Sequence, residues 1–145
     1  FFIFSFFVFC MTNKKTFYVT TAVDYVNSRP HVGHAFEKVL ADALARWHKQ
    51  KGDKVFFLTG VDENAQKNVQ AAENAGIEVK KFVDKNASLF IELCNVLNIK
   101  YDKFIRTSAK EHSKVVQEII KKIIKMVISI REIMKDIIAL DVRLL

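Results

Sequence analysis

The sequence contains little proline, cysteine or glycine: one proline, two cysteines and four glycines in 145 residues. With so few chain breakers and with half of the residues apolar, a packed core is expected and disorder is not. The length fits one ordinary domain. Cys10 and Cys94 are isolated and match no metal-binding spacing, so a reducing, cytoplasmic setting is the simpler interpretation.

Acidic residues are too few to balance the basic ones. The chain has 23 lysines and arginines against 16 aspartates and glutamates, which gives a formal charge of +7. This excess favours a polyanionic partner such as a nucleotide or RNA, although much of it is lysine from residue 100 onward.

The sequence also lacks an apolar run long enough to span a bilayer. Residues 1–10, "FFIFSFFVFC", are apolar but too short, and they have neither the basic start nor the cleavage site of a signal peptide. Because Met11 follows directly, we expect residues 1–10 to be a translated leader that is not native. A short membrane-associating anchor and a genuine core strand are the alternatives. No membrane partner is expected.

Strand-like and helix-like segments alternate along the chain, which predicts an α/β fold. Such alternation is typical of a parallel sheet with flanking helices, and ligands of these sheets bind beyond the carboxyl ends of the strands. The loop at residues 24–34 and the loop that begins at Val61 both follow strands, so we expect them on the same rim. The predicted strands are 16–23, 54–60 and 104–106; the predicted helices are 31–51, 62–75, 79–97 and one that begins near Ser108.

His31, Gly33 and His34 come at the start of the first predicted helix. Free backbone N–H groups and the helix dipole favour an anion there, and histidines on the first turn add donors for phosphate oxygens. Gly33 has no Cβ, so a flat purine or ribose can lie against the backbone. The residues alone also permit two incidental surface histidines. A metal site is not supported, since no third ligand accompanies the pair.

Asp62 and Glu63 follow the second predicted strand. An acid at this place could hold an ammonium group, coordinate magnesium, or only favour the N-terminus of the following helix. Tyr25, in the first loop, is either a lid over a small pocket or an ordinary packed aromatic residue. The pattern by itself leaves these alternatives open.

Several segments together resemble the methionyl-tRNA synthetase family, from about Thr16 to Lys122. "TTAVDYVN", "PHVGH", "ADALARW" and "FLTGVDEN" follow the order and spacing of that family's T-T-P-x-x-Y-x-N, H-I-G-H, A-D-x-x-A-R-Y and F-x-T-G-T-D-E-H-G. The resemblance implies a class I aminoacyl-tRNA synthetase with a Rossmann-like catalytic domain. Such an enzyme activates methionine with ATP and Mg²⁺ to methionyl-adenylate, then transfers methionine to tRNA.

The resemblance also implies roles for individual residues. His31 and His34 match the histidines that contact the ATP phosphates and the transition state, and Gly33 matches the glycine under the adenosine. The methionine-binding positions match Val23, largely through its backbone, Tyr25, and Asp62, which holds the ammonium group. The departures from the family pattern are Asp24, where many members have a proline, aliphatic or tyrosine residue, Val32 for isoleucine, and Asn64 and Ala65 for His-Gly.

The resemblance ends after Lys122, and codons permitted for the tail encode a paired-cysteine stretch like the family's zinc knuckle when read in a shifted frame. We therefore expect residues 11–122 to be the N-terminal half of the catalytic domain. Residues 123–145 are expected to be a frameshifted tail, helical if ordered. The zinc site is then missing from this chain, and the fragment alone is inactive. The alternatives are another HxGH class I synthetase or nucleotidylyltransferase, or a non-catalytic fragment that binds nucleotide or RNA.

Overall fold

The computed structural model describes residues 15–126. The predictions for residues 1–10, and for the tail from residue 127 onward, lie outside the described residues. The chain divides into two compact units, Phe1–Thr107 and Ser108–Leu145. The first unit carries the sheet, and the part of the second unit that the structure describes contains helix α4 (Lys110–Met126).

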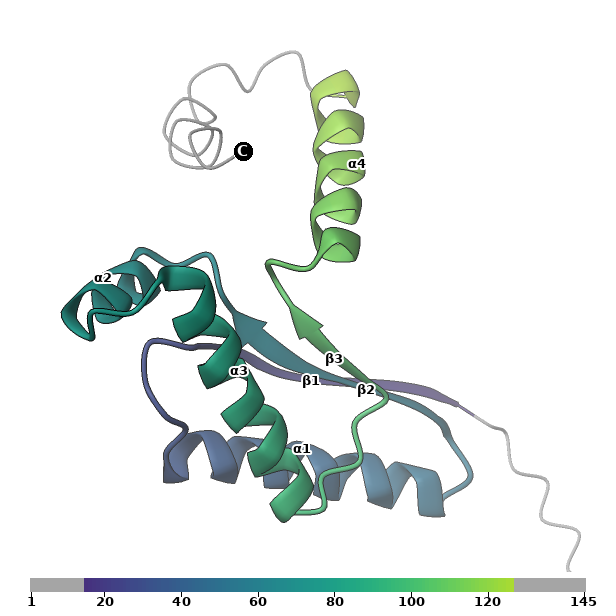
Figure 1. The fold of residues 1–145 in the computed structure, drawn as a ribbon. Helices are drawn as coiled ribbons and strands as arrows, with labels where there is room; N and C mark the ends of the chain where they lie inside the picture. The colour runs from purple at the N-terminus through teal and green to yellow at the C-terminus, as the bar shows by residue number, and fades with distance from the viewer. Residues whose placement is uncertain (1–14, 127–145) are drawn as a thin grey trace, which may run out of the picture. The chain divides into compact units, whose positions relative to one another are not determined.

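The first unit is built on a three-stranded parallel sheet in the order β1-β2-β3 (Figure 1). The predicted α/β fold with a parallel sheet is therefore confirmed, and the order is that of three neighbouring strands in a doubly wound sheet. The strands are β1 (Thr16–Tyr25), β2 (Lys54–Asp62) and β3 (Lys103–Arg106).

Helices connect the strands, as a parallel sheet requires. Two of them, α1 and α3, lie over the same face of the sheet in Figure 1, while α2 lies at one end of it. The helices of the first unit are α1 (Val32–Gln50), α2 (Gln66–Asn74) and α3 (Val79–Val96).

The core lies between this face of the sheet and the two long helices. Phe57 and Val61 of β2 are fully buried, and so are Phe90 and Cys94 of α3. They belong to two apolar clusters, of which one contains Val26, Val61, Val83, Ala87 and Phe90, and the other Ala41, Ala45, Phe57, Cys94 and Ile99.

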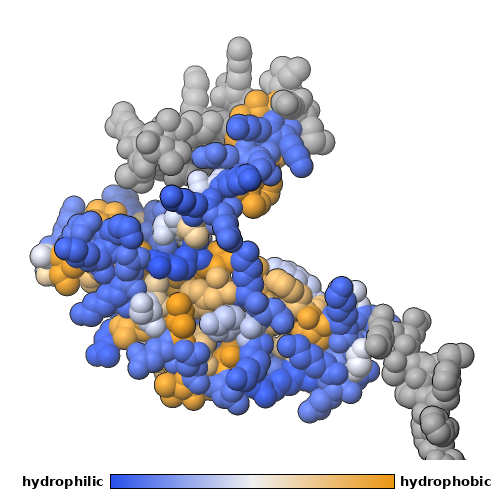
Figure 2. Space-filling view, turned by 45° about the vertical axis from the view of Figure 1, so that its right-hand side comes forward, coloured by the Kyte–Doolittle hydropathy of each residue, from blue (hydrophilic) through white to orange (hydrophobic). Residues whose placement is uncertain are grey.

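Within residues 15–107, no helix covers the opposite face of the sheet. Tyr18 and Phe56 stack there at 6.0 Å between ring centroids, and they are 57% and 43% exposed. Figure 2 shows apolar side chains at the surface among hydrophilic ones. Exposed apolar side chains on a sheet face are typical of a surface that another part of a protein covers.

The apolar stripe of α1 does not face the core. The residues that pack against the sheet are Ala41 and Ala45, together with Lys38 and Asp42. The large apolar side chains recur every three or four residues, as is typical of a helix, but they are exposed: Val32, Phe36, Val39, Leu40, Leu44 and Trp47.

Two strands continue further than the sequence pattern predicts. After an irregularity between Thr20 and Val23, parallel pairing resumes and extends β1 through Tyr25 and β2 through Asp62. The helix expected from residue 62 begins only at Gln66, because the backbone of residues 61–62 is still engaged in the sheet.

The second unit is described through α4 (Lys110–Met126), which confirms the helix predicted after Ser108. Its apolar side chains are exposed at Val115, Ile119, Ile120, Ile123 and Ile124. Among the residues that the structure describes, no helix is both long enough and apolar enough to cross a membrane.

Candidate functional site

The carboxyl ends of β1 and β2 lie next to each other, and the predicted site residues of both strands gather there. Tyr25 is the register partner of Asp62, and Val23 is the partner of Gly60. Val23 and Tyr25 are about half exposed, so both side chains are accessible at this rim. The Lys67 ammonium lies 5.5 Å from the centre of the Tyr25 ring.

The two histidines cap the start of α1 reciprocally. His31 is the N-cap, and its Nδ1 accepts a hydrogen bond from the backbone N–H of Gly33 at 3.1 Å. In return, Nδ1 of His34 accepts from the backbone N–H of His31 at 3.2 Å. The rings stack at 3.8 Å between centroids. This arrangement is a capping box with imidazoles in place of the usual hydroxyl and carboxylate.

Reciprocal capping determines which ring nitrogens can donate. A neutral imidazole has one N–H and one acceptor nitrogen, so a ring whose Nδ1 accepts a backbone N–H carries its own proton on Nε2. His31 and His34 therefore both offer an Nε2–H donor. The backbone N–H groups of His31 and Gly33 are already bonded, so the Nε2–H groups of the two rings are donors that remain for an anion at this helix start.

Gly33 is required by the cap itself. A Cβ at this position would lie 2.9 Å from Cε1 of His31, closer than real Cβ atoms come, and 3.0 Å from its Nδ1. Any other residue would displace the His31 ring that caps the helix. The sequence suggested that glycine stands here to give a ligand access to the backbone. The structure adds a local reason, which is room for the ring of His31.

Sequence reasoning missed Lys38. Its side chain is fully buried and forms an ion pair with Asp24 of β1, whose side chain is 6% exposed. The other carboxylate oxygen of Asp24 lies 3.8 Å from Nε2 of His34. A lysine one turn after the second histidine was the available signal, but lysine on a helix usually lies in solvent.

His34 is enclosed by groups from three elements. Phe90 of α3 packs against its ring at 5.1 Å between centroids, and Asp24 approaches it from β1. Burial lowers the pKa of His34 below its usual value; the negative charge of Asp24 opposes that effect, while His31 and Lys38 add to it. The unliganded site therefore favours the neutral ring.

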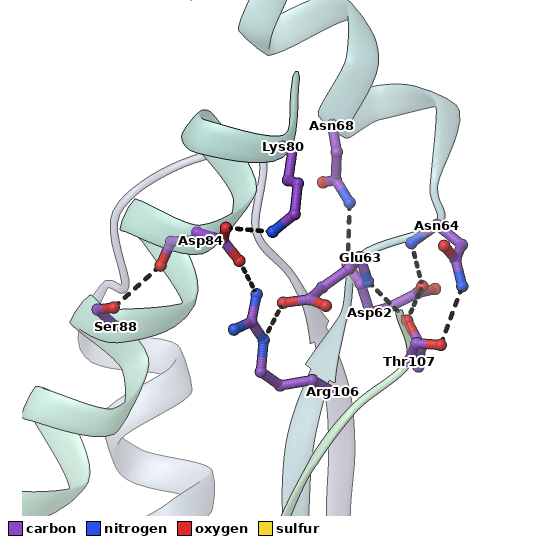
Figure 3. Close-up of polar contacts among 9 residues, drawn as sticks. All are labelled: Asp62, Glu63, Asn64, Asn68, Lys80, Asp84, Ser88, Arg106 and Thr107. Carbon is purple, nitrogen blue, oxygen red and sulfur yellow. Dashed lines mark hydrogen bonds and ion pairs between the residues drawn. The ribbon is translucent and has the colours of Figure 1, made fainter. Parts of the chain in front are cut away.

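Asp62 is held by donors from two loops (Figure 3). Its Oδ1 accepts hydrogen bonds from the Thr107 hydroxyl at 3.2 Å and from the Asn64 backbone N–H at 3.1 Å. The Asn68 amide donates to the Asp62 carbonyl oxygen at 2.9 Å. The carboxylate is thus oriented by residues beyond the ends of β2 and β3.

Glu63 points to the other side of the strand, as Figure 3 shows. Its buried carboxylate accepts from Nε of Arg106 at 2.6 Å, and the same guanidinium pairs with Asp84 of α3. Lys80 also bonds Asp84, at 2.7 Å. Glu63 therefore links β2, β3 and α3, and only Asp62 faces the rim with Tyr25.

The helix-capping alternative for the two acids is wrong. Helix α2 has Ala65 as its N-cap, and its first turn contains no acidic residue. Within residues 15–126, no three histidine, cysteine or acidic side chains are grouped so that they could hold a metal ion.

Known proteins are similar to this chain in sequence and fold. Residues 17–138 match the family described as tRNA synthetases class I (M). The methionine–tRNA ligase of Clostridium tetani is 45% identical over 111 residues, which are 77% of this chain and 17% of the relative. That of Thermotoga maritima is 47% identical over 106 residues, 73% of this chain and 17% of the relative.

Solved structures agree. The Mycobacterium tuberculosis methionyl-tRNA synthetase in complex with methionyl-adenylate matches with a TM-score of 0.68 and 43% identity, over 69% of this chain and 20% of that one. A leucyl-tRNA synthetase from Agrobacterium radiobacter has the same TM-score at 22% identity, over 78% of this chain and 15% of its own, which supports the fold alone. The chain spans only about a fifth of the length of these relatives.

Proposed function

We propose that this chain, which belongs to the family of class I tRNA synthetases (M), provides one half of a site where ATP activates methionine. The relatives are named methionine–tRNA ligases. The proposal is that the rim formed by β1, β2 and the start of α1 takes part in the same activity. The full reaction forms methionyl-adenylate and pyrophosphate, then transfers methionine to tRNA. ATP with Mg²⁺, methionine and tRNA are the proposed substrates, and the cytoplasm is the proposed location.

ATP is assigned to the start of α1. The Nε2–H donors of His31 and His34 would contact phosphate oxygens, where the positive end of the helix dipole adds to the attraction. Phosphoryl and nucleotidyl transfer depend mostly on positioning and on stabilising the charge that develops in the transition state. Gly33 leaves room beneath the adenosine.

Methionine is assigned to the strand ends. The Asp62 carboxylate, oriented by Thr107 and Asn64, would hold the ammonium group. Tyr25 and Val23 would contact the side chain and backbone of the amino acid. The ammonium of a bound amino acid and the carboxylate that holds it form a charge-assisted hydrogen bond, which is stronger than a neutral one.

One observation carries the proposal: the register pairs Tyr25 with Asp62 at the carboxyl ends of two adjacent parallel strands. The family resemblance assigned both residues to methionine binding, although they come from two separate segments of the sequence. Strand pairing brings these segments side by side. The rim of a parallel sheet is also where ligands of such folds bind.

The test is methionine-dependent pyrophosphate exchange in a grafted enzyme. Residues 16–107 replace the matching segment of the Mycobacterium tuberculosis methionyl-tRNA synthetase, which supplies the rest of the protein. Exchange is expected in the graft and is expected to fall about 100-fold or more in His34→Ala. His48→Ala, at the far end of α1, is the matched control and should retain exchange. A graft that folds but gives no exchange would favour a non-catalytic role for this segment.

The chain by itself is expected to give no exchange, because it covers only a fifth of its relatives. Exchange that depended on another amino acid would instead support the alternative of a different HxGH synthetase.

A further inference from the structure

A buried carboxylate connects a buried lysine to the second histidine of the cap. One carboxylate oxygen of Asp24 forms an ion pair with the Lys38 ammonium, and the other lies 3.8 Å from Nε2 of His34. Lys38 and His34 lie one turn apart on α1, while Asp24 is on β1. Phe90 packs against both, at 5.1 Å from the His34 ring and 5.8 Å from the Lys38 ammonium.

Stability alone is a poor explanation of this pair. Taking two charges out of water costs about as much as their attraction returns, so apolar residues of similar size serve a core as well or better. The side chains of Lys38 and Asp24 are 0% and 6% exposed, so they bear most of that cost. The pair also lies directly against a histidine to which the proposed function gives a role.

The other groups around His34 do not replace Asp24. Helix α1 contributes His31, Lys38 and Glu37, and the Glu37 carboxylate accepts from the Ala22 backbone N–H at 2.8 Å. From α3 come the Phe90 ring and, beside the ion pair, the Cys94 thiol. Asp24 is the carboxylate that approaches Nε2 itself.

We propose that Asp24 is a positioning residue for His34, a proposal that rests on the function proposed above. Held by Lys38 through one oxygen, Asp24 presents the other to Nε2–H and, together with the cap at Nδ1, stabilises the tautomer that can donate to a phosphate. At 3.8 Å the contact is longer than a hydrogen bond, so the N–H stays free to bond a ligand. The Lys38 charge cancels that of Asp24 and removes the repulsion that a bare carboxylate would exert on phosphate.

Substituting Asp24→Asn tests this arrangement with almost no change of shape. The ammonium of Lys38 can only donate hydrogen bonds, so it would donate to the oxygen of the new amide. The amide NH₂ would then face Nε2 of His34, which already carries a proton. The two donors repel each other, so the ring is expected to move or to shift its proton to Nδ1, and Nδ1–H cannot accept from the His31 backbone N–H. A wrong tautomer is known to disable a catalytic histidine whose aspartate becomes asparagine.

The double substitution Asp24→Asn with Lys38→Met should reverse the effect. Methionine is about as long as the lysine side chain but has no donor for the amide oxygen. That oxygen can then accept a hydrogen bond from Nε2–H of His34. A role limited to filling space would not predict that a second substitution restores the tautomer lost by the first.

The experiment is ¹⁵N NMR of the full chain labelled at histidine, with long-range correlations that show which ring nitrogen carries the proton. The expected result is Nε2–H for His34 in the wild type, loss of that signature in Asp24→Asn, and its return in the double variant. Asp42→Asn, which removes the charge of another α1 ion pair (Asp42–Arg46, 2.5 Å), is the matched control and should leave His34 unchanged.

Two results would overturn the proposal. A wild-type His34 protonated on Nδ1 would do so even if no variant folded, and so would a tautomer that is the same in all four proteins. In the grafted enzyme, Asp24→Asn is expected to lower exchange about 100-fold, with recovery in the double variant. A graft without any exchange would count against the proposed function, whereas the NMR result would stand on its own.

Discussion

The Thr107 hydroxyl lies between the two acids at the end of β2, Asp62 and Glu63. It donates to Oδ1 of Asp62 at 3.2 Å, and its oxygen accepts from the Glu63 backbone N–H at 2.8 Å. Thr107 comes directly after β3, so a residue 45 positions away in the sequence orients the carboxylate assigned to methionine. The end of β3 thereby takes part in the site, although none of its residues was a candidate from the sequence.

Replacing Thr107→Val is expected to weaken methionine binding in the grafted enzyme. Valine has nearly the same shape but leaves Asp62 with one donor fewer and removes the Thr107 oxygen that accepts from the Glu63 N–H. Loss of a hydrogen bond to a charged group costs about 1.5–3 kcal/mol, so the KM for methionine should rise about tenfold or more. Thr107→Ser, which keeps the hydroxyl, should bind normally. If the KM for methionine were the same in Thr107→Val and in Thr107→Ser, the assignment would be contradicted.

Gly60→Ala is expected to destabilise the first unit strongly. A Cβ at this position would lie 2.2 Å from the carbonyl oxygen of Ile105, its partner on β3, and backbone cannot move aside as a flexible side chain would. The unfolding free energy should fall by about 1–3 kcal/mol or more, as measured by urea denaturation. Gly76→Ala is the control, because position 76 has a positive φ of 63° but open space around it, and should cost only about 1 kcal/mol. A smaller loss at position 60 than at position 76 would be inconsistent with this packing.

The helices and strands were predictable because their signals are local. Alternation of strand and helix patterns gave the parallel sheet, and the motif at the start of α1 placed His31, Gly33 and His34 correctly at a helix start beside the rim. The strand ends were not predictable in the same way. Residues 24–25 look like a turn in isolation, but pairing with residues 61–62 holds them in the sheet.

The buried side of α1 was not predictable from periodicity. The period identified the helix, yet the face against the sheet carries Ala41 and Ala45, since small residues allow the helix to approach closely. Lys38 and Asp42 lie on that face because each has a charged partner. The partner of Lys38 is on β1, and the other oxygen of Asp42 accepts from the backbone N–H of Lys100, so the helical pattern alone cannot reveal why these two side chains are buried.

This arrangement predicts opposite responses from two phenylalanines. Phe36 on α1 is 70% exposed, so Phe36→Ser should change the unfolding free energy of this chain by no more than about 0.5 kcal/mol. Phe57 on β2 is fully buried, and Phe57→Ala should cost about 3–5 kcal/mol through lost burial and a cavity. Urea denaturation followed by circular dichroism measures both. A large loss at Phe36 would mean that the apolar stripe of α1 is covered in solution.

Acid should weaken the contact between α3 and the strand ends through Asp84. Hydrogen bonds from Lys80 and then Arg106 lower the pKa of Asp84 below its usual value of 3.8. A carboxylate with a depressed folded-state pKa stabilises the fold above the unfolded pKa, and this contribution disappears as the pH falls through the lower, folded-state value. The stabilisation is thus present at neutral pH and is lost progressively below about pH 4.

The measurement compares unfolding free energies of the wild type and Asp84→Asn between pH 7 and pH 2. The difference should be largest at neutral pH and should shrink as Asp84 becomes protonated, since the neutral acid then resembles the amide. Because the Asp84 side chain is 41% exposed, added salt should reduce the difference at neutral pH. Glu78→Gln is the control, since its contact with Lys81 is longer, at 3.8 Å, and both side chains are mostly exposed. A difference for Asp84→Asn that stayed constant down to pH 2 would show that the Arg106 contact does not depend on the charge of Asp84.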